Sequence, residues 1–281
     1  MAWGADHRRT LPWRETRDPW CILVSEIMLQ QTQADRVVPY YEAFVGAFPT
    51  PQACAAAPVG DVVRLWSGLG YNRRALNLHR AATVITAEHG GRVPHDDGAL
   101  RALPGVGVYT ARAVRAFAFA DPVAPVDTNV MRILSRCVSG ETRSVAETQR
   151  LADALVPSDD AWAFNQTVFD LGALVCTGTR PACGICPLNR QCVWRRRGRP
   201  DPDPWRASPS ARPQSRFAGS TRQGRGRLVD ALRRGVVTPE GLALACGWPD
   251  DPARAHDVAA ALVAEGFAHW STGRSRVLAL R

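Results

Sequence analysis

The sequence of 281 residues contains no lysine, so all 35 of its basic residues are arginines. The absence of a side-chain amine excludes catalysis through a lysine Schiff base. Acidic residues are also comparatively few, since 26 of them leave a formal net charge of +9 at pH 7. This balance favours a polyanionic partner, although the same charge would also serve solubility alone.

Long apolar runs are missing as well. No run approaches the roughly 18 residues of a membrane-spanning helix, and the opening MAWGADHRRTLPWRE has no apolar core like that of a signal peptide. We therefore expect a cytoplasmic protein with no membrane partner. Because thiols stay reduced in that compartment, the eight cysteines are not expected to form disulfides.

Strand-like alternation is scarce, whereas apolar residues recur at spacings of three and four in PWCILVSEIMLQQT, NRRALNLHRAATVITAEHG and VAETQRLADALV. The chain is therefore predicted to be all-α. Beyond Arg195 the composition becomes rich in Pro, Arg and Ser, which predicts a linker at 196–217 between a domain at 1–195 and a small unit at 218–281.

The small unit is expected to hold three helices followed by a hairpin, which is the element order of a winged helix. Its recognition helix would lie at about Asp251 to Gly266. Because units of this kind bind protein about as often as DNA, the pattern leaves the partner of this unit open.

Half of the cysteines lie in the loop CTGTRPACGICPLNRQC, as Cys176, Cys183, Cys186 and Cys192. Zinc ribbons usually place two CxxC pairs on separate knuckles, whereas here one short loop carries all four thiols. The spacing favours a single [4Fe-4S] cluster with four thiolate ligands, with zinc as the alternative. The other cysteines have apolar neighbours and are expected to be small core residues. These are Cys21, Cys54, Cys137 and Cys246.

The gaps of six, two and five residues between the cysteines of the loop resemble those of the helix-hairpin-helix DNA glycosylases, in the branch shared by endonuclease III and the MutY-type adenine glycosylases. The resemblance extends from about Thr10 to Arg195. It implies a two-lobed all-α fold and a monomer that acts on double-stranded DNA with a mismatched or damaged base at the bacterial nucleoid. It also implies that the cluster orders a loop which presents arginines to DNA phosphates. The arginines suitably placed are Arg180, Arg190 and Arg195 to Arg197.

The segment LPGVGVYTARAV joins two helical stretches through Gly105, Val106 and Gly107. Glycines in a tight turn before a helix leave amide hydrogens free to hold a phosphate oxygen, although an ordinary turn between helices uses the same residues. Together with VDTNVMR downstream, this segment is similar to the hairpin and aspartate of the family. The resemblance implies DNA contacts at the hairpin, a catalytic role for Asp127, and a role for Asn129 in orienting it.

Removal of a base builds positive charge on deoxyribose, which an ionised carboxylate can stabilise or trap. Adenine also leaves poorly unless a ring nitrogen is protonated, which needs a second carboxyl kept protonated in a dry pocket. The stretch EIMLQQT is similar to the MutY-type motif, which implies Glu26 as general acid to N7 and Asp127 as electrostatic or nucleophilic partner.

Tyr109 occupies the hairpin position that carries a lysine in the bifunctional lyases of the superfamily. A monofunctional glycosylase that leaves an abasic site is therefore expected. The Tyr109 hydroxyl could bond Asp127 or the sugar, or the ring could simply pack beside the hairpin.

A target base flipped out of the duplex leaves a gap that a side chain must fill. The resemblance assigns this wedge to QQT and the base pocket to LPWR and FNQ. The residues concerned are Gln30, Gln31 and Thr32 for the wedge, and Trp13, Arg14 and Gln166 for the pocket.

The predicted reaction is hydrolysis of the N-glycosidic bond of adenine mispaired with 8-oxoguanine or guanine. A thymine or uracil mismatch glycosylase would share the cysteine loop, the hairpin and the aspartate, but an apolar residue is typical there at the position of Gln166. A non-catalytic iron-sulfur DNA-binding protein would need neither carboxyl.

Two features depart from the MutY-type pattern. The motif GLGYN ends in Asn72, where those enzymes have a second tyrosine that stacks beside the opposite 8-oxoguanine. The C-terminal region is also too short and too helical for the Nudix-like domain with which they read 8-oxoguanine. The check of the opposite base is therefore expected to be absent, shortened, or carried by the small C-terminal unit.

Overall fold

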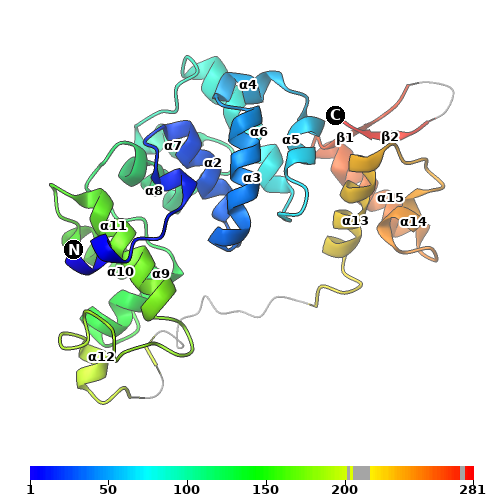
Figure 1. Cartoon of the computed structure of the whole chain (residues 1–281). Helices are drawn as coiled ribbons and strands as arrows, with labels where there is room; N and C mark the ends of the chain where they lie inside the picture. The colour runs from blue at the N-terminus through cyan, green and yellow to red at the C-terminus, as the bar shows by residue number, and fades with distance from the viewer. Residues whose placement is uncertain (201–202, 205–215, 273–275) are drawn as a thin grey trace. The chain divides into compact units, whose positions relative to one another are not determined.

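The computed structural model describes residues 1–200, 203–204, 216–272 and 276–281. Within these ranges the chain is mostly helical, as predicted, and its strands form a single short hairpin near the C-terminus (Figure 1). No helix in the described part of the chain is long and apolar enough to cross a membrane.

The described residues fall into two compact units, and each is discontinuous in sequence. Unit 1 contains Met1–Glu26, His95–Arg101 and the described residues between 106 and 204, whereas unit 2 contains Ile27–Pro94, Ala102–Gly105 and the described residues between 216 and 281. The predicted division at 1–195, 196–217 and 218–281 stays a prediction, and most of its linker lies outside the described residues.

Unit 1 is built from short helices around the start of α2 (Pro19–Leu29). The others are α1 (Ala2–Asp6), η1 (Pro12–Arg14), most of α7 (Asp97–Ala102), α8 (Val108–Ala118), α9 (Thr128–Ile133), η2 (Leu134–Ser139), α10 (Val145–Leu155), α11 (Ala161–Asp170), η3 (Leu171–Val175) and α12 (Val193–Arg196).

Three helices of unit 1, α9, α10 and α11, begin where a short polar side chain bonds the free amides of the first turn. Asp160 caps α11, and Ser144 and Glu147 form a reciprocal capping box at α10. Ile133, Leu171 and Val175 then form a buried cluster that joins α9 to η3. Because η3 leads directly into the cysteine loop, this cluster fixes where the loop begins.

Unit 2 contains the end of α2 and a layer of longer helices, and also the C-terminal elements. Its remaining elements are α3 (Ala34–Ala47), α4 (Pro51–Ala56), α5 (Val59–Leu65), α6 (Arg73–Glu88), α13 (Thr221–Arg234), α14 (Leu242–Cys246), α15 (Pro252–Ala264), β1 (Ala268–Trp270) and β2 (Leu278–Leu280).

The central helix of unit 2 is α6, whose apolar residues recur at helical spacing. Ala75, Leu78, Ala82 and Ile85 are all fully buried, so one face of the helix lies in the core. Beside them, the ring of Trp66 meets a phenylalanine of α3 edge to face with centroids 6.0 Å apart.

The C-terminal elements follow the predicted order of three helices and a hairpin. Asp251 caps α15, and β1 pairs with β2 in antiparallel register, with Ala268 opposite Leu280. The likeness of this region to a winged helix, and the partner of the region, stay predictions.

Candidate active site

Glu26 lies on α2 among apolar neighbours and is 4% exposed. Its Oε2 atom has no hydrogen-bond partner in the described part of the chain. The pKa of this carboxyl is raised from 4.5 to about 7, mainly by burial; a hydrogen bond from Tyr109 lowers it, the charge of Asp127 raises it, and the charge of Arg14 lowers it. Glu26 is thus a carboxyl that can carry a proton at neutral pH.

Tyr109 lies on α8, the helix that follows the predicted hairpin, and its hydroxyl donates to the Glu26 carboxylate. Burial and the charges of Glu26 and Asp127 hold the pKa of Tyr109 well above its usual value of 10. The phenol therefore stays protonated and serves as a hydrogen-bond donor between the two carboxyls.

Asp127 is the N-cap of α9 and holds its carboxylate in a different environment. Its Oδ1 accepts hydrogen bonds from the backbone amides of Asn129 and Val130, each at 2.8 Å, and its Oδ2 accepts one from Asn129 Nδ2 at 2.7 Å. Burial raises the pKa of Asp127 above its usual value, and these bonds and the charge of Arg132 offset only part of that rise. Donors surround this carboxylate and favour its ionised form, unlike that of Glu26.

Arg132 fixes the orientation of the Asn129 amide. Its Nη2 donates to Asn129 Oδ1 at 2.6 Å and to the Gly172 carbonyl at 2.7 Å, and its Nε donates to the Cys176 carbonyl at 2.6 Å. The Asn129 Oδ1 is thereby occupied, so its amide hydrogens face Asp127. A chain of hydrogen bonds consequently joins Asp127 to the first residue of the cysteine loop.

The approach of η3 to α9 depends on a glycine. A Cβ atom at Gly172 would lie 2.6 Å from the Cβ atom of Asn129, which is closer than real Cβ contacts come. Any larger residue would push apart the two segments that Arg132 connects.

Arg14 is buried beside Glu26 but is already paired. Its Nη1 and Nη2 donate to the two carboxylate oxygens of Asp170 at 2.7 and 2.9 Å, and Arg9 Nε donates to the same carboxylate at 2.6 Å. A forked pair of this kind holds the LPWR segment rigidly on α11. Trp13, which is 7% exposed, is buried along with it.

Gln166 also lies on α11 and is 4% exposed. Its side-chain amide makes no hydrogen bond within the described residues, whereas the adjacent Asn165 donates to the Val123 carbonyl at 2.9 Å. A buried amide that lacks a protein partner is available to bind a polar ligand.

In unit 2, Arg74 joins the predicted wedge segment to the GLGYN segment. Its Nη1 donates to the carbonyls of Met28 and Gln30 at 2.7 and 2.6 Å, and its Nη2 donates to Thr32 Oγ1 at 3.2 Å and to the Gly70 carbonyl at 3.1 Å. The guanidinium is buried, which lowers its pKa to about 10. These contacts bring Gln30 and Thr32 close to the turn that precedes Asn72.

The tips of these two segments have unusual backbone conformations. Gln31 and Tyr71 adopt φ values of 57° and 48°, in the left-handed region that side chains other than glycine rarely enter. Both residues are exposed. Local strain of this kind is held only where the surroundings determine it, and Arg74 supplies that constraint here.

Replacing Arg74 with Met is expected to lower the free energy of unfolding by about 2–4 kcal/mol, since several buried carbonyls would lose their only charged donor. Urea unfolding monitored by circular dichroism would measure the change. Arg64→Met is the matched control, because the Arg64 side chain is 52% exposed and pairs only with the exposed Asp61. Equal stability of the two variants would contradict the role of Arg74.

The hairpin uses only one of its glycines for an unusual conformation. Gly105 has φ +82°, and a Cβ atom there would lie 2.8 Å from the Asn77 side chain, whereas Gly107 is extended with open space around it. Gln30 Nε2 approaches the Gly105 carbonyl at 3.5 Å. Val106 is buried, while the two glycines are exposed.

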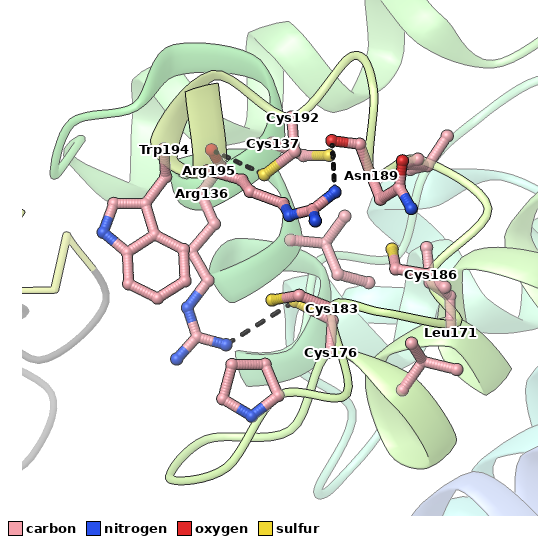
Figure 2. Close-up of a pocket in the computed structure, with 14 residues that line it drawn as sticks. Arg136, Cys137, Leu171, Cys176, Cys183, Cys186, Asn189, Cys192, Trp194 and Arg195 are labelled. Atoms are coloured by element: carbon pink, nitrogen blue, oxygen red, sulfur yellow. Dashed lines mark hydrogen bonds between the residues drawn. The ribbon is translucent and has the colours of Figure 1, made fainter. Parts of the chain in front are cut away.

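The four cysteines of the loop line one pocket in unit 1, and none is in a disulfide (Figure 2). Cys137 of η2 lines the same pocket, so the prediction that it is simply a core residue was incomplete. Its thiol is hydrogen-bonded to Cys192, the last cysteine of the loop.

Arg136 forms one wall of this pocket and is 1% exposed. Its Nη1 approaches Cys176 Sγ at 3.5 Å and donates to the Thr177 carbonyl at 2.7 Å, as Figure 2 shows for the sulfur contact. The guanidinium also pairs with Asp203 and lies 5.0 Å from the Trp194 ring centroid. A positive charge is therefore held permanently beside the thiols.

The structure brings Glu26, Tyr109, Asp127 and Asn129 together in unit 1, and Gln30, Thr32 and Asn72 onto neighbouring segments of unit 2. Sequence reasoning missed three buried arginines that position these groups. They are Arg74, Arg132 and Arg136. Two of them stand inside the quoted motifs or next to them. Arg74 and Arg132 bond mainly backbone carbonyls, and Arg136 bonds two carbonyls and the distant Asp203, and no local sequence pattern predicts these contacts.

Comparison with known proteins adds three findings. The family described as HhH-GPD superfamily base excision DNA repair protein matches residues 24–158. An adenine DNA glycosylase of Mycolicibacterium smegmatis is 43% identical over 271 residues, which make up 95% of this chain and 90% of that protein.

Two solved structures share the fold. A thermostable thymine-DNA glycosylase matches with a TM-score of 0.67 and 33% identity, over 70% of this chain and 93% of that one. A trapped covalent intermediate of endonuclease III with DNA matches with a TM-score of 0.61 and 26% identity, over 70% and 92% of the respective chains.

Proposed function

Because the chain belongs to the adenine DNA glycosylases, a family of helix-hairpin-helix enzymes of base excision repair, we propose that it removes adenine paired with 8-oxoguanine or guanine. One observation carries the mechanism. Two buried carboxyls lie in the same unit: Glu26 has one oxygen with no hydrogen-bond partner among the described residues, whereas Asp127 accepts three hydrogen bonds. Such a pair divides acid and electrostatic roles at neutral pH.

Glu26 acts as the general acid. Its protonated carboxyl, whose Oε2 has no partner among the described residues, donates a proton to N7 of the flipped adenine, and the C1′–N9 bond then breaks with its electron pair going to the base. Tyr109 holds the other side of the carboxyl by its hydroxyl. The adenine departs as a neutral molecule.

Asp127 stabilises the sugar cation that this step creates. The carboxylate is fixed by the α9 amides and by Asn129, so its charge needs no reorganisation when the cation forms. Water then adds to C1′ and gives its extra proton to the Glu26 carboxylate, which completes an abasic site and restores the acid. Because the chain has no lysine, the enzyme is monofunctional and leaves the strand intact.

Gln166 is the residue proposed to read the adenine edge. Its buried amide oxygen can accept a hydrogen bond from the N6 amino group of adenine, while N7 receives the proton of Glu26. Arg14 acts indirectly, by holding Trp13 and its segment on α11 through Asp170.

The exposed, left-handed Gln31 is proposed as the wedge that fills the gap left by the flipped base, with Gln30 and Thr32 supporting it. The hairpin at Gly105 and Gly107 would hold a DNA phosphate through its outward amides. We further propose that the enzyme acts as a monomer on mismatched DNA in the cytoplasm, at the nucleoid.

A [4Fe-4S] cluster fits the donor set of the cysteine loop. Cys176, Cys183, Cys186 and Cys192 are free thiols on one pocket, and among the described residues no three potential ligands gather closely enough for a single metal ion. A cluster instead takes one thiolate at each of its irons. When bound, it supplies a rigid, negatively charged anchor for the loop beside Arg136.

Replacing Cys183 with Ser is expected to lower the iron content and the visible absorbance of the purified protein, because one of the four thiolates would be lost. Iron and sulfide assays on freshly purified protein would measure this. Cys246→Ala is the control, since that buried cysteine belongs to unit 2 and does not line the pocket of the loop cysteines. Zinc in place of iron in the wild type would contradict the cluster.

The second candidate is a thymine or uracil mismatch glycosylase, which the likeness to the thymine-DNA glycosylase favours. That likeness covers 70% of the chain, whereas the mycobacterial adenine glycosylase matches 95% and so includes the C-terminal region. The longer match supports adenine.

A single experiment separates the two candidates. Base excision is followed under single-turnover conditions on duplexes that pair A, T or U with 8-oxoguanine or G, and alkali reveals the abasic sites. Release of adenine opposite 8-oxoguanine is the expected result. Release of T or U opposite G, with adenine retained, would favour the mismatch enzyme.

A further inference from the structure

Arg233, near the end of α13, reaches the segment that contains Asn72 within unit 2. Its Nη2 donates to Asn72 Oδ1 at 2.9 Å, and its Nε donates to the Val63 carbonyl at 3.0 Å. The side chain is only 8% exposed, and its Nη1 pairs with Asp230 one turn earlier. The guanidinium is thus held at three points and cannot turn away from Asn72.

The C-terminal elements are attached to α5 and α6 by further contacts. Glu265 pairs with Arg73 at 2.8 Å and with Arg225 at 2.8 Å, and the backbone amide of Gly60 donates to the carbonyl of Arg281. The contact between Arg233 and Asn72 is therefore one of several contacts that hold the C-terminal elements against the rest of unit 2. These other contacts do not touch Asn72.

The bond from Arg233 decides which way the Asn72 amide faces. Because Oδ1 is occupied, the Nδ2 hydrogens point elsewhere, and they have no partner among the described residues. Asn72 directly follows the exposed and strained Tyr71. The Asn72 Nδ2 group is therefore a hydrogen-bond donor with a fixed direction. It lies at the position where, in the family that the chain resembles, a tyrosine contacts the base opposite the adenine.

The helix expected to act as a recognition helix offers little for DNA. The exposed residues of α15 include Ala260, Ala261 and the acidic Asp257, and its one arginine, Arg254, already donates to the Gly219 carbonyl and to Thr221. Phosphate binding by this face has little charge to support it. The charged group that reaches Asn72 from the C-terminal elements belongs instead to α13.

We propose that Arg233 is a positioning residue for opposite-base recognition. From the C-terminal elements it orients the Asn72 amide, whose Nδ2 then donates to a carbonyl oxygen of the oxopurine opposite the adenine. This inference rests on the proposed function. It accounts for both departures from the MutY-type pattern. A hydrogen bond from Asn72 replaces the stacking of the second tyrosine, and the short C-terminal region supplies Arg233, which orients the Asn72 amide.

The test measures the preference of the full-length enzyme for adenine opposite 8-oxoguanine over adenine opposite an abasic-site analogue, as a ratio of single-turnover rates. Arg233→Met is expected to lower this ratio about five- to tenfold, the size of one hydrogen bond. Asn72→Asp should lower it equally. The aspartate keeps its contact with Arg233 but has no hydrogen to donate, so this variant tests the donor even if Arg233→Met fails to fold.

Arg225→Met is the matched control. It removes one ion pair to Glu265 and leaves the contact with Asn72 in place, so the ratio should stay that of the wild type. The double variant Asn72→Ala with Arg233→Met should lose no more than Asn72→Ala alone, since both act on one contact.

An unchanged ratio in folded Arg233→Met or in Asn72→Asp would overturn the proposal. An equal loss in Arg225→Met would do so too, because docking as a whole would then be responsible. Failure of the proposed function looks different, since the wild type itself would release no adenine from any duplex.

Discussion

Replacing Asp127 with Asn is expected to reduce the single-turnover rate of adenine release by about a thousandfold or more. The change removes the negative charge that stabilises the sugar cation. It also creates a conflict, because Arg132 holds the Asn129 amide with its hydrogens toward residue 127, where the new side chain would present hydrogens as well. Quantification of abasic sites after alkali would give the rate.

Asp160→Asn is the matched control for this variant. Asp160 is also an N-cap in unit 1, where it accepts from the Ala163 amide, and Asn caps a helix nearly as well as Asp. Its activity should equal that of the wild type, and Asp127→Asn should still bind mismatched DNA. If the Asp127→Asn variant excised adenine at the normal rate, the proposed role of the Asp127 charge would be wrong.

Glu26→Gln is expected to slow adenine release by about 10²- to 10⁴-fold, the usual contribution of a general acid. The amide keeps the shape of the carboxyl but has no proton to give to N7. In the wild type the rate should fall about tenfold for each pH unit above about 7, because the pKa of Glu26 is raised to about 7 and only its protonated form acts. The residual rate of the variant should lack this decline.

The same pKa predicts how stability depends on pH. Between pH 4.5 and about 7 the folded protein keeps the Glu26 proton that the unfolded chain releases, so the contribution of Glu26 to stability falls as pH rises through this window. The Glu26→Gln variant has no titrating group at this position, so this part of the decrease in stability with rising pH should be absent. Urea unfolding at pH 5 and pH 8 should therefore show a smaller loss for the variant, and identical losses would mean that Glu26 does not hold its proton.

Several conclusions could be drawn from the sequence because local patterns carry them. Apolar spacing predicts the helices, as the four buried residues of α6 illustrate. The cysteine loop is a single short segment, so its thiols must lie near one another whatever the rest of the chain does. The motifs around Glu26 and Asp127 name the two carboxyls through family resemblance, but they do not give the environment of either.

Those environments depend on contacts between distant segments. Glu26 meets Tyr109 and Asp127 only after α2, α8 and the start of α9 pack together, and Arg14 pairs with Asp170, which lies 156 residues further along the chain. The pKa of Glu26 is raised mainly by burial, which is a property of the packed core rather than of the residue. No spacing in the chain predicts it.

The sequence by itself therefore determined the helical class, the set of chemical groups and the missing lysine. The tertiary structure alone decided how those groups are aimed, through Arg74, Arg132 and Arg233. Each of these arginines bonds at least one backbone carbonyl. Every residue has a carbonyl, so only folding selects which ones an arginine will meet.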